Sequence, residues 1–84
     1  MKERVKTYVK VVLEVDPDGN ITPKSIQLHE DGPTFEVTGV IGRPVQAAAM
    51  KAGGIGMRYE VLIGRKQTYL WDEDGRWFVE EKVG

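Results

Sequence analysis

Apolar and polar residues alternate along much of the chain, and this alternation predicts β-strands. From Val5 to Val15 apolar side chains occupy nearly every second position, which is the pattern of a strand with one buried face. Asp16-Pro17-Asp18-Gly19 follows, and aspartate first, proline second and glycine fourth suit a type I turn. We therefore expect a hairpin with a return strand over 20–28. Pro23 marks a break or an edge in that strand, because proline donates no hydrogen bond.

The next stretch predicts a third strand that bends. Pro33–Ile41 is rich in strand-forming residues, and Phe35 and Val37 fall on one face of it. Gly39 lies in its interior, where a missing side chain is typical of a bulge or a sharp bend. We expect Gly42-Arg43-Pro44 to end this strand, because glycine and proline interrupt regular structure.

A segment with helical propensity comes after that strand. Val45–Lys51 contains three consecutive alanines, but seven residues are too few for a stable isolated helix. We expect an irregular crossing with at most one helical turn. A flexible, glycine-rich loop is then expected over Ala52–Gly56.

The carboxy-terminal third predicts a meander of three strands and holds five of the seven aromatic residues. The strand-like runs are Tyr59–Ile63, Thr68–Trp71 and Arg76–Val79. Gly64-Arg65-Lys66 joins the first two runs, and Asp72–Gly75 joins the last two. Connections this short force each strand back beside the previous one.

Turn chemistry predicts the registers of these strands. A two-residue loop at Gly64-Arg65 places Arg58 opposite Trp71. A type I turn with a glycine bulge at 72–75 places Trp71 opposite Trp77. We expect the core face to be the one without charge, which carries Tyr59, Val61, Ile63, Leu70 and Phe78. The opposite face then carries Arg58, Glu60, Leu62, Tyr69, Trp71, Trp77 and Val79.

The composition fits a single small domain. With 84 residues, ten glycines and four prolines, the chain has room for one core and many turns, and frequent turns favour short strands. Hydrophobic residues at 40% and charged residues at 30% lie in the ordinary globular range. We therefore expect one all-β domain over 1–84. It is either a small SH3-like barrel or a strongly twisted antiparallel meander of about five strands.

Three segments of the chain resemble small uncharacterised proteins from Gram-positive bacteria, chiefly clostridia and their relatives. These segments are Gly53-Gly54-Ile55-Gly56-Met57-Arg58-Tyr59, Gly64-Arg65-Lys66 with Leu70, and Gly75-Arg76-Trp77-Phe78-Val79. The likeness extends to Asp18–Pro23 and Asp31-Gly32, and so covers most of the chain from about Val9 onward. It implies no activity, because none is assigned to that group. Strand count and turn order also resemble SH3-like small barrels, a likeness of fold that carries no function.

Charge and cysteine content narrow the function classes. Twelve basic against thirteen acidic side chains give a net charge of −1, which removes the simplest argument for binding nucleic acid or a membrane surface. The chain has no cysteine, so we expect no disulfide framework, which fits a reducing cytoplasm. Lys10 and Glu14 interrupt the apolar residues near the amino terminus. We expect neither a signal peptide nor a transmembrane helix.

No residue pattern predicts catalysis, a bound metal or a cofactor. The chain has one serine, Ser25, and one histidine, His29, near opposite ends of the same expected strand. A catalytic triad needs the nucleophile and the base within hydrogen-bond reach, which this arrangement does not provide. The segment Asp16–Asn20 has the alternate spacing of the first ligands in an EF-hand loop, but the glycine and the bidentate carboxylate that such a loop requires are missing.

The aromatic face of the meander is the strongest candidate for a binding site. We expect Tyr69, Trp71 and Trp77 to lie beside Arg58. Small barrels hold single-stranded nucleic acid by stacking its bases on aromatic rings that have basic groups nearby. The same residue types dominate hot spots between proteins. The amino-terminal strand or the crossing at 45–50 can equally cover these rings. The candidate residues are Arg58, Tyr69, Trp71 and Trp77 on the face, with Lys51, Gly53, Gly54, Arg65 and Lys66 on adjoining loops.

The leading hypothesis is a non-enzymatic binding module that contacts another protein or a second copy of itself. The contact is expected through the aromatic face and the Gly53–Gly56 loop. Binding of single-stranded RNA or DNA is the alternative, which nearby acidic residues such as Glu60 and Asp72 weaken by opposing a positive field. We expect no membrane contact. Replacing Trp71 and Trp77 together with smaller polar residues is expected to leave the fold intact.

Overall fold

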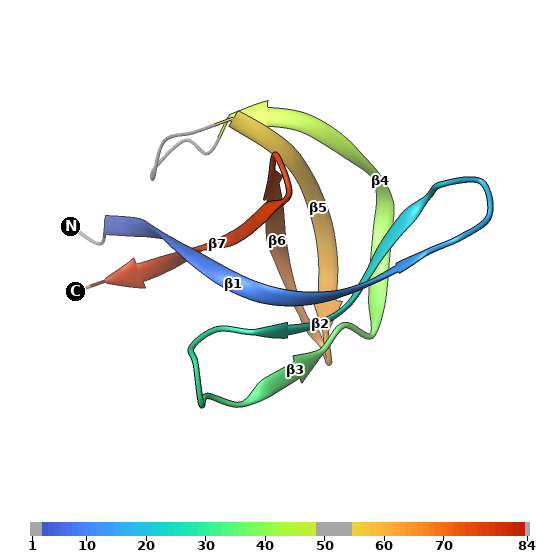
Figure 1. Cartoon of the computed structure of the whole chain (residues 1–84). Helices are drawn as coiled ribbons and strands as arrows, with labels where there is room; N and C mark the ends of the chain where they lie inside the picture. The colour runs from blue at the N-terminus through green and yellow to red at the C-terminus, as the bar shows by residue number, and fades with distance from the viewer. Residues whose placement is uncertain (1–2, 49–54, 84) are drawn as a thin grey trace.

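The computed structural model describes residues 3–48 and 55–83, which form one curled antiparallel sheet of seven strands (Figure 1). The strands are β1 Glu3–Val15, β2 Ile21–Gln27, β3 Thr34–Glu36, β4 Gly39–Ala48, β5 Ile55–Ile63, β6 Lys66–Glu73 and β7 Arg76–Val83. The predicted all-β class is confirmed, and the strands number seven where about five were expected. Within these ranges no helix has the length and apolar character needed to cross a membrane.

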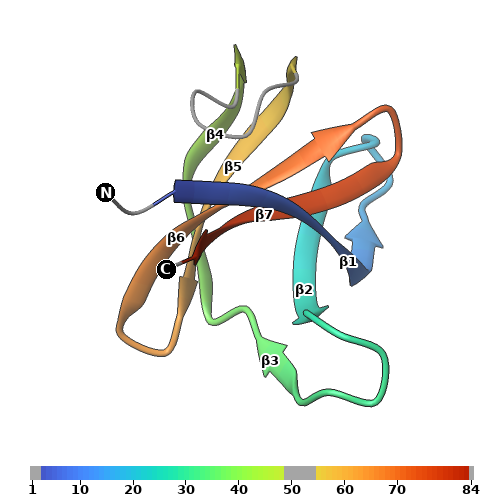
Figure 2. The same cartoon turned by 90° about the vertical axis from the view of Figure 1, so that its left-hand side faces the viewer.

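Strands that follow one another in the chain are neighbours in the sheet, apart from β3 and β4. The order is β3-β2-β1-β7-β6-β5-β4, so β1 also pairs with β7. This is the order of an up-and-down barrel left open between β3 and β4. Figure 2 shows β2 and β4 on opposite sides of the curl. The connection between β3 and β4 ties the two edges together, because the Val37 N–H donates to the Lys24 carbonyl at 2.9 Å and the Thr38 N–H donates to the Leu62 carbonyl at 2.8 Å.

The first hairpin follows the predicted turn chemistry. The Gly19 N–H donates to the Asp16 carbonyl at 2.9 Å, and Gly19 has a φ of +86°. The Asn20 N–H donates to the Asp16 carboxylate, and this bond, first among several, holds the pKa of Asp16 below its ordinary value. β2 is continuous through Pro23 and lies between β3 and β1, so the expected break or edge strand is absent. Pro23 is instead accommodated where the β1–β2 register shifts, just before the pair Leu13–Pro23.

The strand expected over Pro33–Ile41 is divided into two. β3 ends at Glu36 and β4 begins at Gly39, so the interruption lies directly before the glycine for which a bulge or bend was predicted. Phe35 of β3 lies opposite Ile26 of β2.

The expected strand end at Gly42-Arg43-Pro44 and the irregular crossing over Val45–Lys51 are wrong. β4 continues to Ala48, and Val45–Ala48 pairs with β5. The register shifts between Ile41 and Val45, so residues 42–44 form a bulge in β4. Gly42 permits this bulge because it adopts a φ of +66°. Pairing with β5 satisfies the backbone groups of 45–48 and outweighs the helical propensity of so short a segment. The rest of the expected crossing and most of the expected glycine-rich loop lie at 49–54, outside the described residues.

The concave face of the sheet holds the main core. Tyr59, Val61 and Leu70 are buried there, as the alternation in the meander predicted. The rings of Tyr59 and Trp77 lie 5.1 Å apart between centroids. Each large apolar side chain buried in this way contributes about 1.5–3 kcal/mol. The full set of buried core residues is Ile26, Val37, Tyr59, Val61, Leu70, Trp77 and Val79.

The β5–β6 register is as predicted, with Arg58 opposite Trp71, but the β6–β7 register is not. Trp71 pairs with Phe78 and not with Trp77. The reason is the turn. Asp74 and Gly75 have φ values of 50° and 89°, as in a two-residue type I′ turn, whereas a glycine bulge adds a residue to one strand. The shift by one residue puts Trp77 and Val79 in the concave core and moves Phe78 to the convex face.

A Gly75→Ala substitution is expected to lower the free energy of unfolding by about 1–2 kcal/mol, because a side chain is strained at positive φ. Gly39→Ala is the matched control. Its added Cβ would meet only Leu62 Cδ1, at an ordinary 3.5 Å, and much less loss is expected. Urea unfolding of both variants measures the difference, and equal losses would contradict the type I′ turn.

Candidate interaction surface on the convex face

The convex face carries a row of directly opposed side chains that crosses five strands. Val45 lies opposite Arg58, Arg58 opposite Trp71, Trp71 opposite Phe78, and Phe78 opposite Tyr8. We call these five residues the convex row. The Trp71 and Phe78 rings stack with centroids 5.6 Å apart and 3° between their planes, and Tyr8 meets Phe78 edge-on at 5.9 Å. Such ring pairs contribute about 0.5–1.5 kcal/mol beyond their burial, so the row stabilises the sheet from outside the main core.

Arg58 links the buried part of the convex row to an exposed ring. Its guanidinium carbon lies 4.5 Å from the ring centroid of Tyr69 and 5.9 Å from that of Trp71. Tyr69 is 43% exposed, whereas Trp71 is 2% exposed. A cation over a ring is attracted by the negative ring face. Arg58 and Tyr69 therefore form a preassembled cation–aromatic pair at the surface.

The predicted aromatic face is divided between the two sides of the sheet. Arg58, Tyr69 and Trp71 come together on the convex face, but Trp77 lies in the concave core and is 7% exposed. The expectation that Trp71 and Trp77 share one open face is therefore wrong. The expectation that both can be replaced without loss of the fold is wrong for the same reason, because both indoles are buried.

The remaining candidate residues lie on a turn or beyond the described ranges. Arg65 and Lys66 are exposed at the turn between β5 and β6. Gly56, expected in a flexible loop, is paired with Ala47 in the sheet. A Cβ at Gly56 would come within 2.6 Å of a main-chain oxygen of β6, so close approach of the backbone requires glycine there. Lys51, Gly53 and Gly54 are outside the described residues.

A charged cluster that the sequence reasoning missed holds β1 against the β6–β7 turn. Lys6 Nζ donates to Glu73 Oε2 at 3.0 Å, and the Tyr8 hydroxyl donates to Glu73 Oε1 at 2.6 Å. The Arg76 guanidinium lies 3.9 Å from the Tyr8 ring centroid, and Lys6 Nζ lies 4.7 Å from that of Phe78. Alternation along β1 puts Lys6 and Tyr8 on one face, but only the pairing of β1 with β7 brings them to Glu73.

This cluster shifts the pKa of two of its members. The hydrogen bond from Tyr8, and then that from Lys6, stabilise the Glu73 carboxylate and lower its pKa. The bond to Glu73 in turn raises the pKa of Lys6. Both shifts favour the ionised pair near neutral pH.

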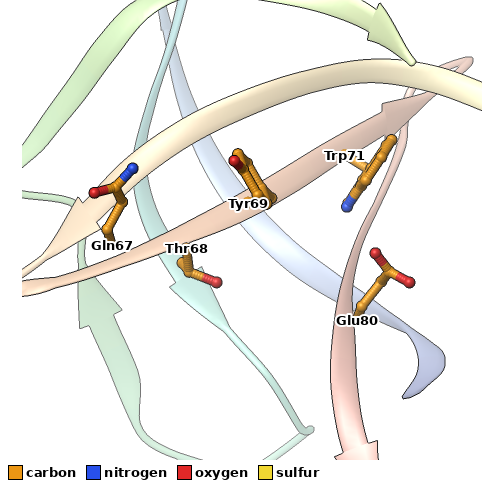
Figure 3. A pocket seen from close by; sticks show the side chains of 5 residues that line it. All are labelled: Gln67, Thr68, Tyr69, Trp71 and Glu80. Carbon is orange, nitrogen blue, oxygen red and sulfur yellow. The ribbon is translucent and has the colours of Figure 1, made fainter. Parts of the chain in front are cut away.

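A half-open hollow lies beside Trp71 on the convex face. It has a volume of about 380 Å³ and is lined by Gln67, Thr68, Tyr69, Trp71 and Glu80 (Figure 3). Trp71 Nε1 is buried and finds no hydrogen-bond partner among the described residues. Figure 3 shows this nitrogen turned towards the side of the hollow where the Glu80 carboxylate lies. A buried donor without an acceptor costs about 1–3 kcal/mol. An acceptor that reached the Trp71 Nε1–H would remove this cost.

The described residues include no group of three or more histidine, cysteine, aspartate or glutamate side chains that could hold a metal ion. His29 Nε2 lies 4.0 Å from Glu81 Oε2 with a largely exposed side chain, and Ser25 lies in the strand ladder opposite Val12. Neither contact is a nucleophile–base hydrogen bond.

Comparison of the chain with protein-family models, with curated proteins and with solved structures gives no significant match. Functional inference therefore rests on the geometry of the sheet and its two faces.

Trp77→Ala is expected to lower the free energy of unfolding by about 3–5 kcal/mol, because it empties the centre of the concave core. Tyr69→Ala, at an exposed position, is expected to cost about 1 kcal/mol or less. Urea titrations followed by circular dichroism compare the two. A Tyr69→Ala loss as large as that of Trp77→Ala would contradict the assignment of faces.

Glu73→Gln is expected to give a pH-dependent loss of stability. The folded-state pKa of Glu73 is lowered, so its contribution is present above the ordinary carboxyl pKa and is lost as the pH falls through the lowered value. The stability difference between wild type and Glu73→Gln should be largest near neutral pH and shrink below about pH 4. Tyr8→Phe removes the main stabilising bond and should move this loss to higher pH. A difference that stays constant from neutral to acid pH would argue against the cluster.

Proposed function

We propose that the protein is a non-enzymatic interaction module that associates with a second copy of itself through the convex face. The observation that carries this proposal is a group of four side chains on three neighbouring strands, three of them exposed and Arg58 half-buried. Ile41 and Val45 of β4 are 39% and 47% exposed. Val45 lies opposite Arg58 of β5, and Ile41 lies in the same cross-strand row as Tyr69 of β6. We call Ile41, Val45, Arg58 and Tyr69 the β4–β6 patch.

The composition of the β4–β6 patch suits a protein contact. Tyrosine and arginine are the residue types that dominate interface hot spots, and Ile41 and Val45 add apolar area. Among the described residues β4 is also an edge strand of the sheet, where main-chain groups lack a neighbouring strand. The bulge at 42–44 interrupts this edge, so pairing between edges is short and side chains carry most of the contact.

The charges of the patch favour a second copy as the partner. Glu60 lies between Ile41 and Tyr69 in the same cross-strand row, one row from Arg58. A two-fold contact places the same surface against itself, so a surface that offers both Arg58 and Glu60 is complementary to its own copy.

Binding of single-stranded nucleic acid has less support. It needs exposed rings on which bases stack, and of the three candidate rings only Tyr69 is open to solvent. Glu60 and Glu73 lie on the same convex side and oppose the approach of phosphates.

Sedimentation velocity tests the proposal. The wild-type chain is expected to sediment as a dimer in the micromolar range, and Val45→Lys is expected to weaken the dimer at least tenfold, about 1.4 kcal/mol, by placing like charges beside Arg58 in both copies. Val12→Lys is the matched control, because Val12 is 55% exposed on β1 outside the β4–β6 patch. A wild-type monomer at every concentration, or equal weakening by the control, would overturn the proposal.

A further inference from the structure

β6 and β7 pair with each other over three residues each, Trp71–Glu73 with Arg76–Phe78. Beyond that point β6 stays beside β5 back to Lys66, while β7 stays beside β1 to Val83. Figures 1 and 2 show the two strands leaving their shared turn and diverging. The sheet is therefore split beyond the Trp71–Phe78 pair. β6 forms one side of the split and is held by β5, and β7 forms the other side and is held by β1.

The main-chain groups of Gln67 and Tyr69 face this split. In an antiparallel ladder, alternate residues direct their N–H and C=O to the same neighbouring strand. The pairs Ile63–Lys66 and Glu73–Arg76 close two-residue turns at the two ends of β6, and such closing pairs are hydrogen bonded. Even-numbered residues of β6 therefore bond to β5, and odd-numbered residues face β7. Gln67 and Tyr69 are the odd-numbered residues that lie outside the β6–β7 register.

Hollows open on both faces of the sheet beside the split. The convex hollow has a volume of about 380 Å³ and the concave one about 540 Å³. Gln67, Thr68 and Glu80 line both of them, so the two hollows meet at the split. The apolar lining of the concave hollow consists of Ile26, Leu28, Phe35, Ile63 and Val79.

The unused donor of Trp71 is a second and independent sign of a ligand. Trp71 is 2% exposed and lines the convex hollow, and within the described part of the chain its Nε1 has no acceptor. An acceptor that enters the hollow would remove the desolvation cost of this N–H.

We infer that the split binds an extended peptide segment of a partner protein, which adds as a strand antiparallel to β6. Its main-chain groups pair with Gln67 and Tyr69, and its successive side chains enter the two hollows in turn. The concave hollow accepts an apolar side chain. The convex hollow accepts asparagine or glutamine, whose carbonyl receives the Trp71 Nε1–H. This site shares Tyr69 with the β4–β6 patch but lies apart from Ile41 and Val45, and it goes beyond the proposed self-association.

Hydrogen exchange in the free protein tests whether the split is open. In a ¹⁵N-labelled sample, the amides of Gln67 and Tyr69 are expected to exchange at least about tenfold faster than those of Thr68 and Leu70, which bond to β5. Exchange of all four at one slow rate would show that β6 and β7 are paired along their whole length in solution. That result would overturn the inference, whatever the outcome of the sedimentation experiment.

A synthetic probe tests the occupant. The peptide acetyl-Val-Gln-Val-Gln-Val-amide is expected to slow exchange at Gln67 and Tyr69 and to move the Trp71 indole N–H resonance downfield. The same peptide with N-methyl groups on both glutamines cannot form the ladder and is expected not to bind. The Val45→Lys variant should bind the probe as wild type does, which distinguishes peptide binding from self-association through Val45. Absence of binding, or equal binding of the methylated peptide, would contradict strand addition.

Discussion

The type I′ turn at Asp74-Gly75 is the constraint on which both aromatic clusters depend. Its two positive φ values fix Trp71 opposite Phe78. That register sends Trp77 into the concave core against Tyr59 and leaves Phe78 to stack on Trp71 on the convex side. Because side chains alternate with a period of two, a slip by one residue would exchange the rings between the core and the outer face. One short connection therefore decides which rings stabilise the barrel and which rings reach its surface.

The end of the sheet near this turn is tightly held, and the other end is open. Near the turn, Lys6 and Tyr8 reach from β1 to Glu73 beside the stacked rings, and they reinforce the pairing of the first and last strands. Beyond the Trp71–Phe78 pair, β6 and β7 separate and hollows lie on both sides. On either side of the gap, β6 is paired with β5 and β7 with β1, and strands already held in this way need little ordering when a ligand enters.

Much of the fold could be predicted from alternation and turn residues. The first hairpin follows from Asp16 to Gly19, and the β5–β6 register follows from the short loop at Gly64-Arg65. Two features could not be predicted this way. The continuation of β4 past Pro44 depends on pairing with a strand distant in sequence, and the β6–β7 register depends on whether Asp74 adopts a positive φ, which aspartate allows but does not require. The predicted aromatic face is divided for the same reason, since the β5–β6 register brings Arg58 and Tyr69 together and the position of Trp77 depends on the β6–β7 register.

The most direct test of this account is a cross-strand contact in the nuclear Overhauser spectrum. In the type I′ hairpin, Asp72 and Trp77 are a directly opposed pair without mutual main-chain hydrogen bonds, the kind whose Cα atoms approach most closely. We expect a strong contact between the Hα protons of Asp72 and Trp77. Contacts that instead place Trp71 opposite Trp77 would show a different register, with Trp77 on the convex face and the division between core and surface reversed.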